Sequence, residues 1–189
     1  MKKLLVLCFP LLWGCGEVYV PKPKGYPSIS FPEKDYIRIS RTNCPFEFDI
    51  PVYAELNRDS ISSSEPCWLN LDFPDFNATV HLTYKDIIGK NEFIEIQNDT
   101  RKLVFKHAIK AEEIFETPLA NIEKNYFGML YDLTGNAATP LQFYLTDSSK
   151  HYLRGVLYFN TKTNTDSIAP VQQFITQDIY KLINTFSWR

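Results

Sequence analysis

The sequence predicts an α+β fold, an antiparallel sheet on which a central helix and a long C-terminal amphipathic helix pack. Short apolar and aromatic runs separated by Pro, Asn and Asp fill the first half of the chain, as in strands and turns. Three longer β-runs with two turns follow between residues 125 and 159. Apolar residues at helical spacing then close the chain. With 44% hydrophobic and 15% aromatic residues, the chain has material for one substantial core.

The first fifteen residues are typical of a bacterial lipoprotein signal peptide. Lys2 and Lys3 precede an apolar run that ends in Leu-Trp-Gly-Cys at Cys15. A transmembrane span needs ~20 apolar residues, and Glu17 arrives too soon for one. We therefore expect residues 1–14 to be removed and Cys15 to carry a diacylglycerol and a further acyl chain such as palmitate.

The mature chain is expected to hold a tether and one domain. Residues 15–27 contain alternating prolines that favour an extended, semi-rigid segment. Residues 28–189 follow as a single α+β domain. The formal charge of −2 becomes about −4 once Lys2 and Lys3 leave, and no basic cluster remains. Nucleic acid is therefore not an expected partner, and the membrane is reached through the lipid alone.

Five short runs in the first half are predicted as strands, and a polar loop over residues 58–66 interrupts them. These runs cover residues 28–31, 46–50, 52–56, 68–73 and 79–84.

Cys44 and Cys67 are the cysteines left after Cys8 is removed and Cys15 is acylated. An even pair in an exported protein most simply forms a disulfide. A zinc site is the alternative for this pair, but neither a CxxC motif nor paired histidines lie nearby.

Helical spacing returns over residues 91–109, where Ile94, Val104 and Ala108 fall on one stripe. Strands are then expected over residues 125–133, 141–146 and 152–159, joined by Thr-Gly-Asn and Asp-Ser-Ser-Lys turns into an antiparallel meander.

The chain should end in an amphipathic helix over residues 166–188. Asp166 or Ser167 is the expected cap, and Pro170 falls in the first turn. Seven apolar residues form its buried stripe: Ile168, Val171, Ile175, Ile179, Leu182, Ile183 and Phe186. This helix is expected to pack flat on the sheet.

Local signatures of catalysis are missing from the sequence. It contains no HExxH, GxSxG, Walker or GxGxxG motif, and its three histidines do not stand at metal-ligand spacing. Asp75 and Asp147 lie in segments where aspartate is usually a turn residue. We therefore expect no catalytic residue, no metal and no cofactor.

A ligand or partner surface is the remaining possibility for the polar residues. His81 alternates along a strand and is most often structural in such a place, yet His81, Tyr84 and His107 could line a pocket on an exposed sheet face. His151 and Arg154 are three apart on one strand and should point to opposite faces.

The chain resembles the gliding-motility lipoprotein D family (GldD) of Bacteroidetes. The blocks that carry the resemblance span nearly all of the mature chain: residues 21–26, 31–34, 65–68, 73–78, 81–85, 106–107, 135–138, 142–148 and 151–159. The resemblance implies a non-enzymatic accessory protein required for gliding and linked to the type IX secretion machinery. Only Cys15 transfers as a functional position. By analogy, the sheet with its C-terminal helix is similar to the Mog1/PsbP-like sandwich.

Two functions from different classes remain open. The first is a periplasmic scaffold or stabiliser for other gliding and type IX secretion proteins. The second is a periplasmic binder of a small ligand or cell-wall fragment, or a hydrolase acting on one. Surface-exported lipoproteins of Bacteroidetes resemble one another in an acidic run after the lipidated cysteine, whereas Glu17 stands alone here. We therefore expect the protein to face the periplasm, with the inner leaflet of the outer membrane favoured.

Overall fold

The computed structural model describes residues 29–59, 65–107, 110–160 and 165–189. The signal peptide and the expected tether therefore lie outside the described residues. Within these ranges the fold is α+β, as the sequence predicts.

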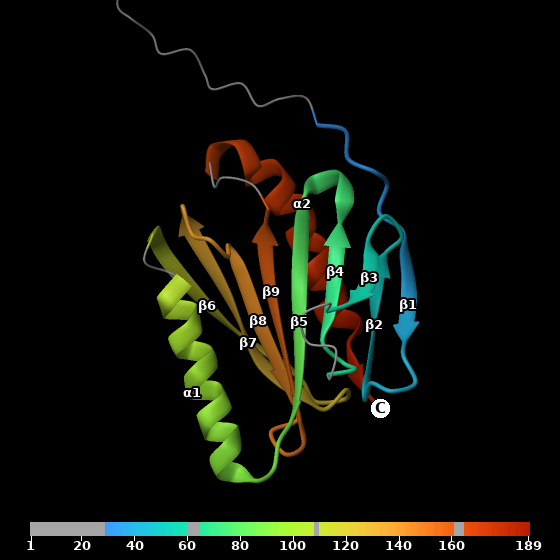
Figure 1. The fold of residues 1–189 in the computed structure, drawn as a ribbon, viewed down its shortest axis with the longest axis vertical. Helices are drawn as coiled ribbons and strands as arrows, with labels where there is room; N and C mark the ends of the chain where they lie inside the picture. The colour runs from blue at the N-terminus through green and yellow to red at the C-terminus, as the bar shows by residue number, and fades with distance from the viewer. Residues whose placement is uncertain (1–28, 60–64, 108–109, 161–164) are drawn as a thin grey trace, which may run out of the picture.

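A seven-stranded antiparallel sheet forms the middle layer (Figure 1). Its strand order is β3-β4-β5-β9-β8-β7-β6. The strands are β3 (Glu55–Arg58), β4 (Leu69–Phe73), β5 (Ala78–Asp86), β6 (Ala111–Asn121), β7 (Tyr126–Gly135), β8 (Leu141–Thr146) and β9 (His151–Phe159). A short 3-10 helix, η1 (Pro74–Phe76), joins β4 to β5, and Asn77 ends it in the left-handed conformation.

The helix α2 (Thr165–Thr185) packs on one face of this sheet beside a small second sheet. The small sheet has the order β1-β2-β10, from β1 (Tyr36–Ser40), β2 (Phe46–Pro51) and β10 (Ser187–Trp188). The main core lies here and contains every residue of the predicted C-terminal stripe, with Ile168 at its margin. Burial of this apolar face is what holds α2 in place.

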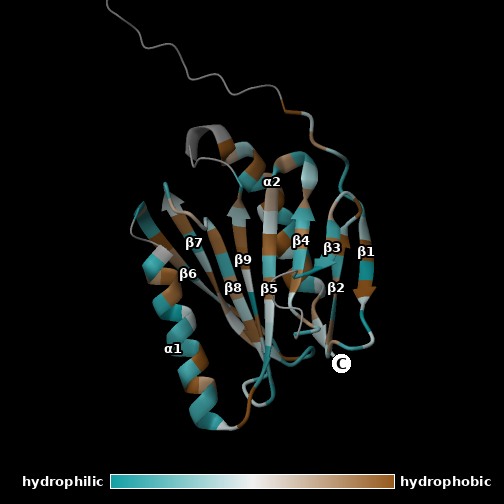
Figure 2. Ribbon diagram, in the orientation of Figure 1, coloured by the Kyte–Doolittle hydropathy of each residue, from teal (hydrophilic) through white to brown (hydrophobic). Residues whose placement is uncertain are grey.

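The helix α1 (Lys90–His107) covers part of the opposite face (Figure 1). Figure 2 shows it as largely hydrophilic, and its buried side is narrow. Val104 and Thr100 are buried, and the Tyr152 hydroxyl donates to Thr100 Oγ1 over 2.8 Å. Ile94, expected on the buried stripe, is instead 45% exposed, because Phe93 and Ile96 take the sheet-facing positions.

Several predicted boundaries are wrong. Ile29 to Phe31 form no strand, although Phe31 stacks on the Phe174 ring at 4.5 Å. The run expected over residues 52–56 is a turn followed by β3, so Arg58 ends a strand rather than opening a loop. Both β1 and β6 were missed by the sequence prediction. Each is a sheet edge with mostly exposed residues, so neither carries a strong apolar pattern.

The C-terminal helix also differs at both ends from the prediction. It begins at Thr165, so Pro170 lies inside the helix rather than in its first turn. The side chains of the expected caps, Asp166 and Ser167, lie outside the described part. It ends at Thr185, where the Arg38 guanidinium donates to the Thr185 carbonyl over 2.6 Å. A cation at this end satisfies a carbonyl without an intrahelical partner, and the chain then turns into β10.

Candidate functional site

Two of the residues predicted to form one ligand or partner surface, His81 and Tyr84, lie on opposite faces of the sheet. Tyr84 belongs to the core cluster under α2, while His81, three residues earlier on β5, points to the opposite face. His81 Nδ1 lies 2.8 Å from Asn70 Oδ1, and its ring meets the edge of Tyr158. This is a structural histidine with a satisfied partner. His107 is the last residue of α1, and its side chain lies outside the described part.

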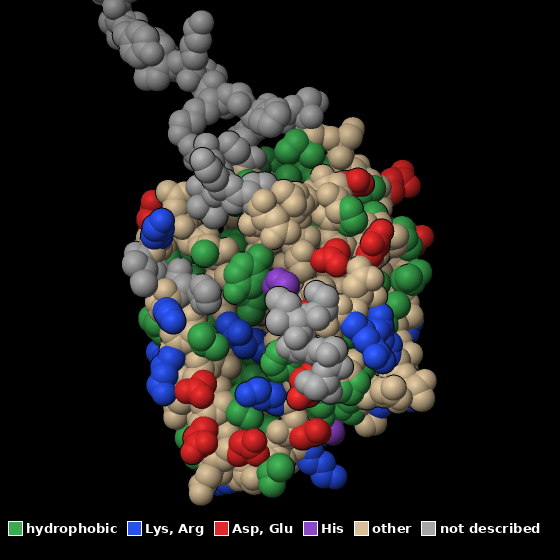
Figure 3. Space-filling model, in the orientation of Figure 1, with side chains coloured by type: hydrophobic (Ala, Val, Ile, Leu, Met, Phe, Trp, Pro, Cys, Tyr) green, Lys and Arg blue, Asp and Glu red, His purple; other side chains and the backbone are tan. Residues whose placement is uncertain are grey.

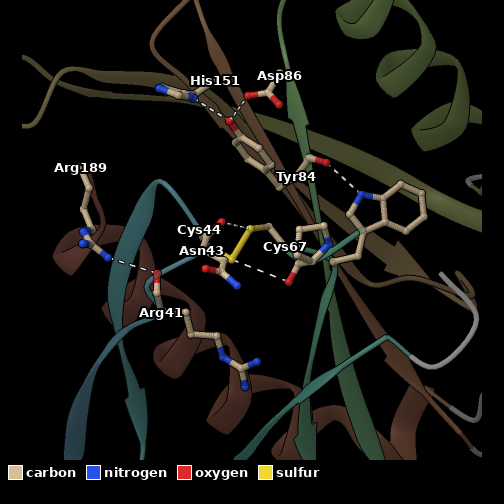
Figure 4. Close-up of a disulfide and its surroundings, with 10 residues drawn as sticks. Arg41, Asn43, Cys44, Cys67, Tyr84, Asp86, His151 and Arg189 are labelled. Carbon is tan, nitrogen blue, oxygen red and sulfur yellow. Dashed lines mark hydrogen bonds between the residues drawn. A yellow bond between two sulfur atoms is a disulfide. The ribbon is translucent and has the colours of Figure 1, made fainter. Parts of the chain in front are cut away.

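Tyr84 instead joins a polar cluster at the end of β5. Its hydroxyl lies 2.5 Å from Asp86 Oδ1 and 2.7 Å from His151 Nδ1 (Figure 4). The residues come together because Tyr84 and Asp86 share one face of β5, and Asp86 pairs directly with His151 of β9. The His151 ring stacks on Trp188 of β10 at 5.1 Å, which ties the cluster to the C-terminus.

The hydrogen bonds define the protonation of this cluster. A carboxylate only accepts, so the single proton of the Tyr84 hydroxyl goes to Asp86. The Nδ1–H of His151 then donates to the Tyr84 oxygen. Burial, with the Asp86 hydrogen bond and charge, raises the pKa of Tyr84 well above its usual range. Tyr84 therefore stays neutral and acts as a bridge that orients His151.

A hollow of about 480 Å³ opens beside this cluster and the disulfide. We call it the His151 groove. Its lining residues include Asn43, Glu65, Pro66, Trp68, Tyr84, Asp86 and His151. The Trp68 indole donates to the Tyr84 carbonyl over 2.9 Å, which fixes the aromatic wall of the groove.

A second hollow of about 570 Å³ lies on the other side of His151. Lys124, Lys150, Trp188 and Arg189 contribute to its lining. Both hollows lie where the chain ends, and Figure 1 shows this end opposite the one at which the described chain begins.

Cys44 and Cys67 form a disulfide, as predicted, with their Cα atoms 5.5 Å apart. The bond links the segment before β2 to the segment before β4, and Cys67 itself lines the His151 groove. Both cysteines are buried. The disulfide therefore holds one wall of the groove against the core.

The hydroxyl and carboxyl groups in the turn beside His151 serve the turn itself. Ser149 is the nearest serine in sequence to His151, but it donates to Asp147 within the turn that joins β8 to β9. Asp147 is thus the turn residue that the sequence predicts. Among the residues with described positions, no three His, Cys, Asp or Glu side chains gather where they could hold a metal ion.

Fold and site together define a PsbP-like sandwich domain with aromatic and charged grooves at one end. The solution structure of cyanobacterial PsbP (CyanoP) from Synechocystis sp. PCC 6803 matches it with a TM-score of 0.50 and 11% sequence identity. The match covers 86% of this chain and 98% of that one, and it concerns the fold alone.

The chain belongs to the gliding motility lipoprotein GldD family, whose model matches residues 16–188. No curated protein matches it. Membership makes it a membrane-associated lipoprotein of gliding motility. Neither described helix has both the length and the apolar character needed to cross a bilayer.

Sequence reasoning found Tyr84 but not its partners. Asp86 and Tyr84 are two residues apart on a strand, and this spacing could have placed them on one face. The pairing of β5 with β9 that brings His151 to them joins strands 67 residues apart. The prediction that His151 and Arg154 point to opposite faces of the sheet is confirmed. His151 contacts Tyr84 on the α2 side, whereas Arg154 donates to Gln142 on the side that carries α1.

Proposed function

We propose that this chain is a non-enzymatic accessory lipoprotein required for gliding, acting in the periplasm as a scaffold or stabiliser for other gliding and type IX secretion proteins. Membership of the gliding motility family over residues 16–188 carries the proposal. The Tyr84, Asp86 and His151 cluster supports it, because its hydrogen bonds position an aromatic and charged surface.

The relation of the two ends of the domain supports a contact role. Cys15 would carry the lipid, and residues 15–27 would act as the tether before the domain. The described chain starts at one end of the molecule, while the His151 groove and the C-terminus lie at the other (Figure 1). A lipid-anchored domain with this layout would present the groove away from the membrane that holds it.

The composition of the groove suits a protein partner. Trp68 lines the His151 groove, and Trp188 and Arg189 line the second hollow on the other side of His151. Tryptophan and arginine are enriched in protein interfaces. By contrast, lysine, arginine and acidic side chains are interspersed on the face that carries α1 (Figure 3). We therefore place the principal contact surface at the C-terminal end.

Complementation of a deletion strain tests this assignment. The deletion should abolish spreading and type IX secretion together, and the wild-type gene should restore both. The double variant Lys150→Glu with Arg189→Glu reverses two charges beside the groove and should restore neither. Lys102→Glu reverses an exposed charge on α1 and is the matched control. A folded, membrane-bound double variant that glides and secretes normally would exclude the second hollow, beside the His151 groove, as the contact surface.

Anchoring and orientation need separate tests. Cys15→Ala should release the protein from membranes, while Cys8→Ala, in the same signal peptide, should leave it attached. We place the protein in the inner leaflet of the outer membrane, facing the periplasm. Protease should then leave it uncut in intact cells and degrade it after permeabilisation. Digestion in intact cells would show that the domain faces outward.

A further inference from the structure

Arg154 is a half-buried cation that forms no ion pair with a carboxylate in the described part of the chain. It lies on β9, on the face toward α1, and its Nη2 donates to Gln142 Oε1 over 2.6 Å. The Gln142 amide donates in turn to Thr139 Oγ1 over 2.8 Å, so a neutral network orients the guanidinium. Arg154 Nε is buried and has no hydrogen-bond partner in the described part of the chain.

This arrangement is costly unless something else neutralises it. A buried N–H without a partner costs about 1–3 kcal/mol, and a buried charge without a counter-charge costs more. Burial accordingly lowers the pKa of Arg154, the direction opposite to the effect of a nearby acid. Glutamine orients a guanidinium without cancelling its charge. The unmet requirement is therefore for an anion.

A cavity of about 140 Å³ adjoins Arg154 between α1 and the sheet. Lys85 of β5 supplies a second cation, and the Thr83 and Thr100 hydroxyls also line the space. Ile96, Leu103 and Tyr152 form apolar walls. At ~30 Å³ per water molecule the volume is of the size of a small group of a few heavy atoms.

One carboxylate does face this cavity, but its side chain is largely exposed to solvent, which screens its charge. Asp99 contributes to the lining, but its Oδ1 lies 3.1 Å from Lys102 Nζ at an exposed position. Arg154 and Lys85 thus face the cavity with only this one acidic side chain, which has its own lysine.

We propose that the cavity binds a small oxyanion, the carboxylate or phosphate group of a soluble ligand, with Arg154 as the principal donor and Lys85 as a second cation. The guanidinium of Arg154 lines the cavity, and its Nη groups can donate to the oxygens of an anion bound there. The apolar walls exclude water and strengthen the interaction. Arg154 lies on the opposite face of the sheet from the Tyr84 side chain, although Lys85 also lines the His151 groove; the proposal does not depend on the scaffold role.

The test is a titration of the soluble mature domain, residues 16–189, followed by NMR of the arginine Nε–H resonances. Arg154→Lys assigns the resonance by its disappearance. Sodium phosphate and sodium acetate are added in separate series at constant ionic strength, with sodium chloride as the reference. We expect a saturable shift of the Arg154 resonance with at least one oxyanion and none with chloride. Phosphate and acetate responses distinguish the two ligand sources.

Variants locate the binding. Lys85→Gln should weaken the apparent affinity several-fold and keep the Arg154 resonance. Lys106→Gln removes an exposed lysine of α1 outside the cavity and should leave the affinity unchanged. Lys85→Gln leaves Arg154 in place, so the test of the site does not depend on whether an Arg154 variant folds. The proposal would be overturned if the Arg154 resonance shifted linearly and equally with all three salts. It would also be overturned if Lys85→Gln and Lys106→Gln changed the apparent affinity equally.

Discussion

Lys34 and Asp178 form an ion pair between residues 144 positions apart, with 2.6 Å between Lys34 Nζ and Asp178 Oδ1. The Asp178 side chain, on α2, is fully buried. The Tyr36 hydroxyl donates to the same oxygen over 2.9 Å, and the Tyr53 hydroxyl donates to Oδ2 over 2.7 Å. Lys34 also lies over the Phe174 ring. Asp178 thus fixes the segment before β1 to α2, at the place where the chain enters the domain.

Replacing Asp178 should destabilise the domain. Asp178→Leu removes the counter-charge of Lys34, which keeps its hydrogen bond to the Phe174 carbonyl, and the acceptor of two tyrosine hydroxyls. We expect a loss of about 2–3 kcal/mol. This is below the ~3–5 kcal/mol of a fully buried pair because Lys34 keeps partial contact with water. Urea unfolding of the soluble domain measures the change. Lys102→Met breaks the exposed pair with Asp99 and should cost less than about 0.5 kcal/mol.

Removing the disulfide should lower the free energy of unfolding, because the unfolded chain gains conformational entropy. Cys44 and Cys67 are 23 positions apart, and opening a loop of this size should cost about 3 kcal/mol. We expect the double serine variant to unfold at lower urea concentration. The wild-type protein should have no thiol that reacts in denaturant without reductant once Cys15 is acylated or replaced. Reaction of two thiols per chain under those conditions would exclude the bond.

Gly128 should not tolerate a side chain. A Cβ at this position of β7 would overlap the backbone carbonyl oxygen of Tyr144 on β8, and backbone in a paired strand has little freedom to move. We expect Gly128→Ala to cost more than the ~1–3 kcal/mol of ordinary overpacking. Gly135→Ala is the comparison variant. Gly135 has a φ of +78° and a Cβ there would meet Glu112, so this substitution adds conformational strain of the backbone. A Gly128→Ala domain with wild-type stability would show that β7 and β8 lie farther apart.

Apolar periodicity predicted the parts of the fold that carry the core. Six apolar residues of α2, with Phe186 just after it, repeat at helical spacing, and β8 is buried at every position. Their apolar sequence patterns therefore marked these elements. Edge strands lacked this signal: β6 contains Glu112, Glu113 and Pro118, and most of its residues are exposed. The cluster of Tyr84, Asp86 and His151 was harder still to predict from the sequence. Tyr84 and His151 are 67 residues apart, and only strand pairing brings them within 2.7 Å.

Asp147 should make stability depend on pH at the acid end. Its Oδ1 accepts the backbone N–H groups of Ser149, Lys150 and His151. Burial acts to raise the pKa of Asp147, but these hydrogen bonds outweigh it and hold the pKa below the usual range. Because the pKa is lower in the folded state, the ionised carboxylate stabilises the fold at pH values above the unfolded-state pKa. That stability is lost as the pH falls through the folded-state pKa.

The comparison with Asp147→Ala measures this contribution. At pH 7 the variant should be less stable by about 1–2 kcal/mol, because three backbone donors lose their acceptor. The difference from wild type should shrink as the pH falls below about 4. A difference in stability that stays constant down to pH 2 would show that ionisation of Asp147 adds nothing to the stability of the turn.

Asp132 on β7 should have the opposite effect, since burial raises the pKa of its carboxyl. A raised folded-state pKa means that the folded protein binds the proton more tightly than the unfolded chain does. The ionised carboxylate therefore destabilises the fold above the raised pKa, and protonation relieves this as pH falls. Asp132→Asn removes the charge and keeps the shape. The variant should be more stable than wild type at pH 7, and the difference should vanish near pH 3. Equal stability of the two proteins at neutral pH would show that Asp132 is solvated well enough to ionise without penalty.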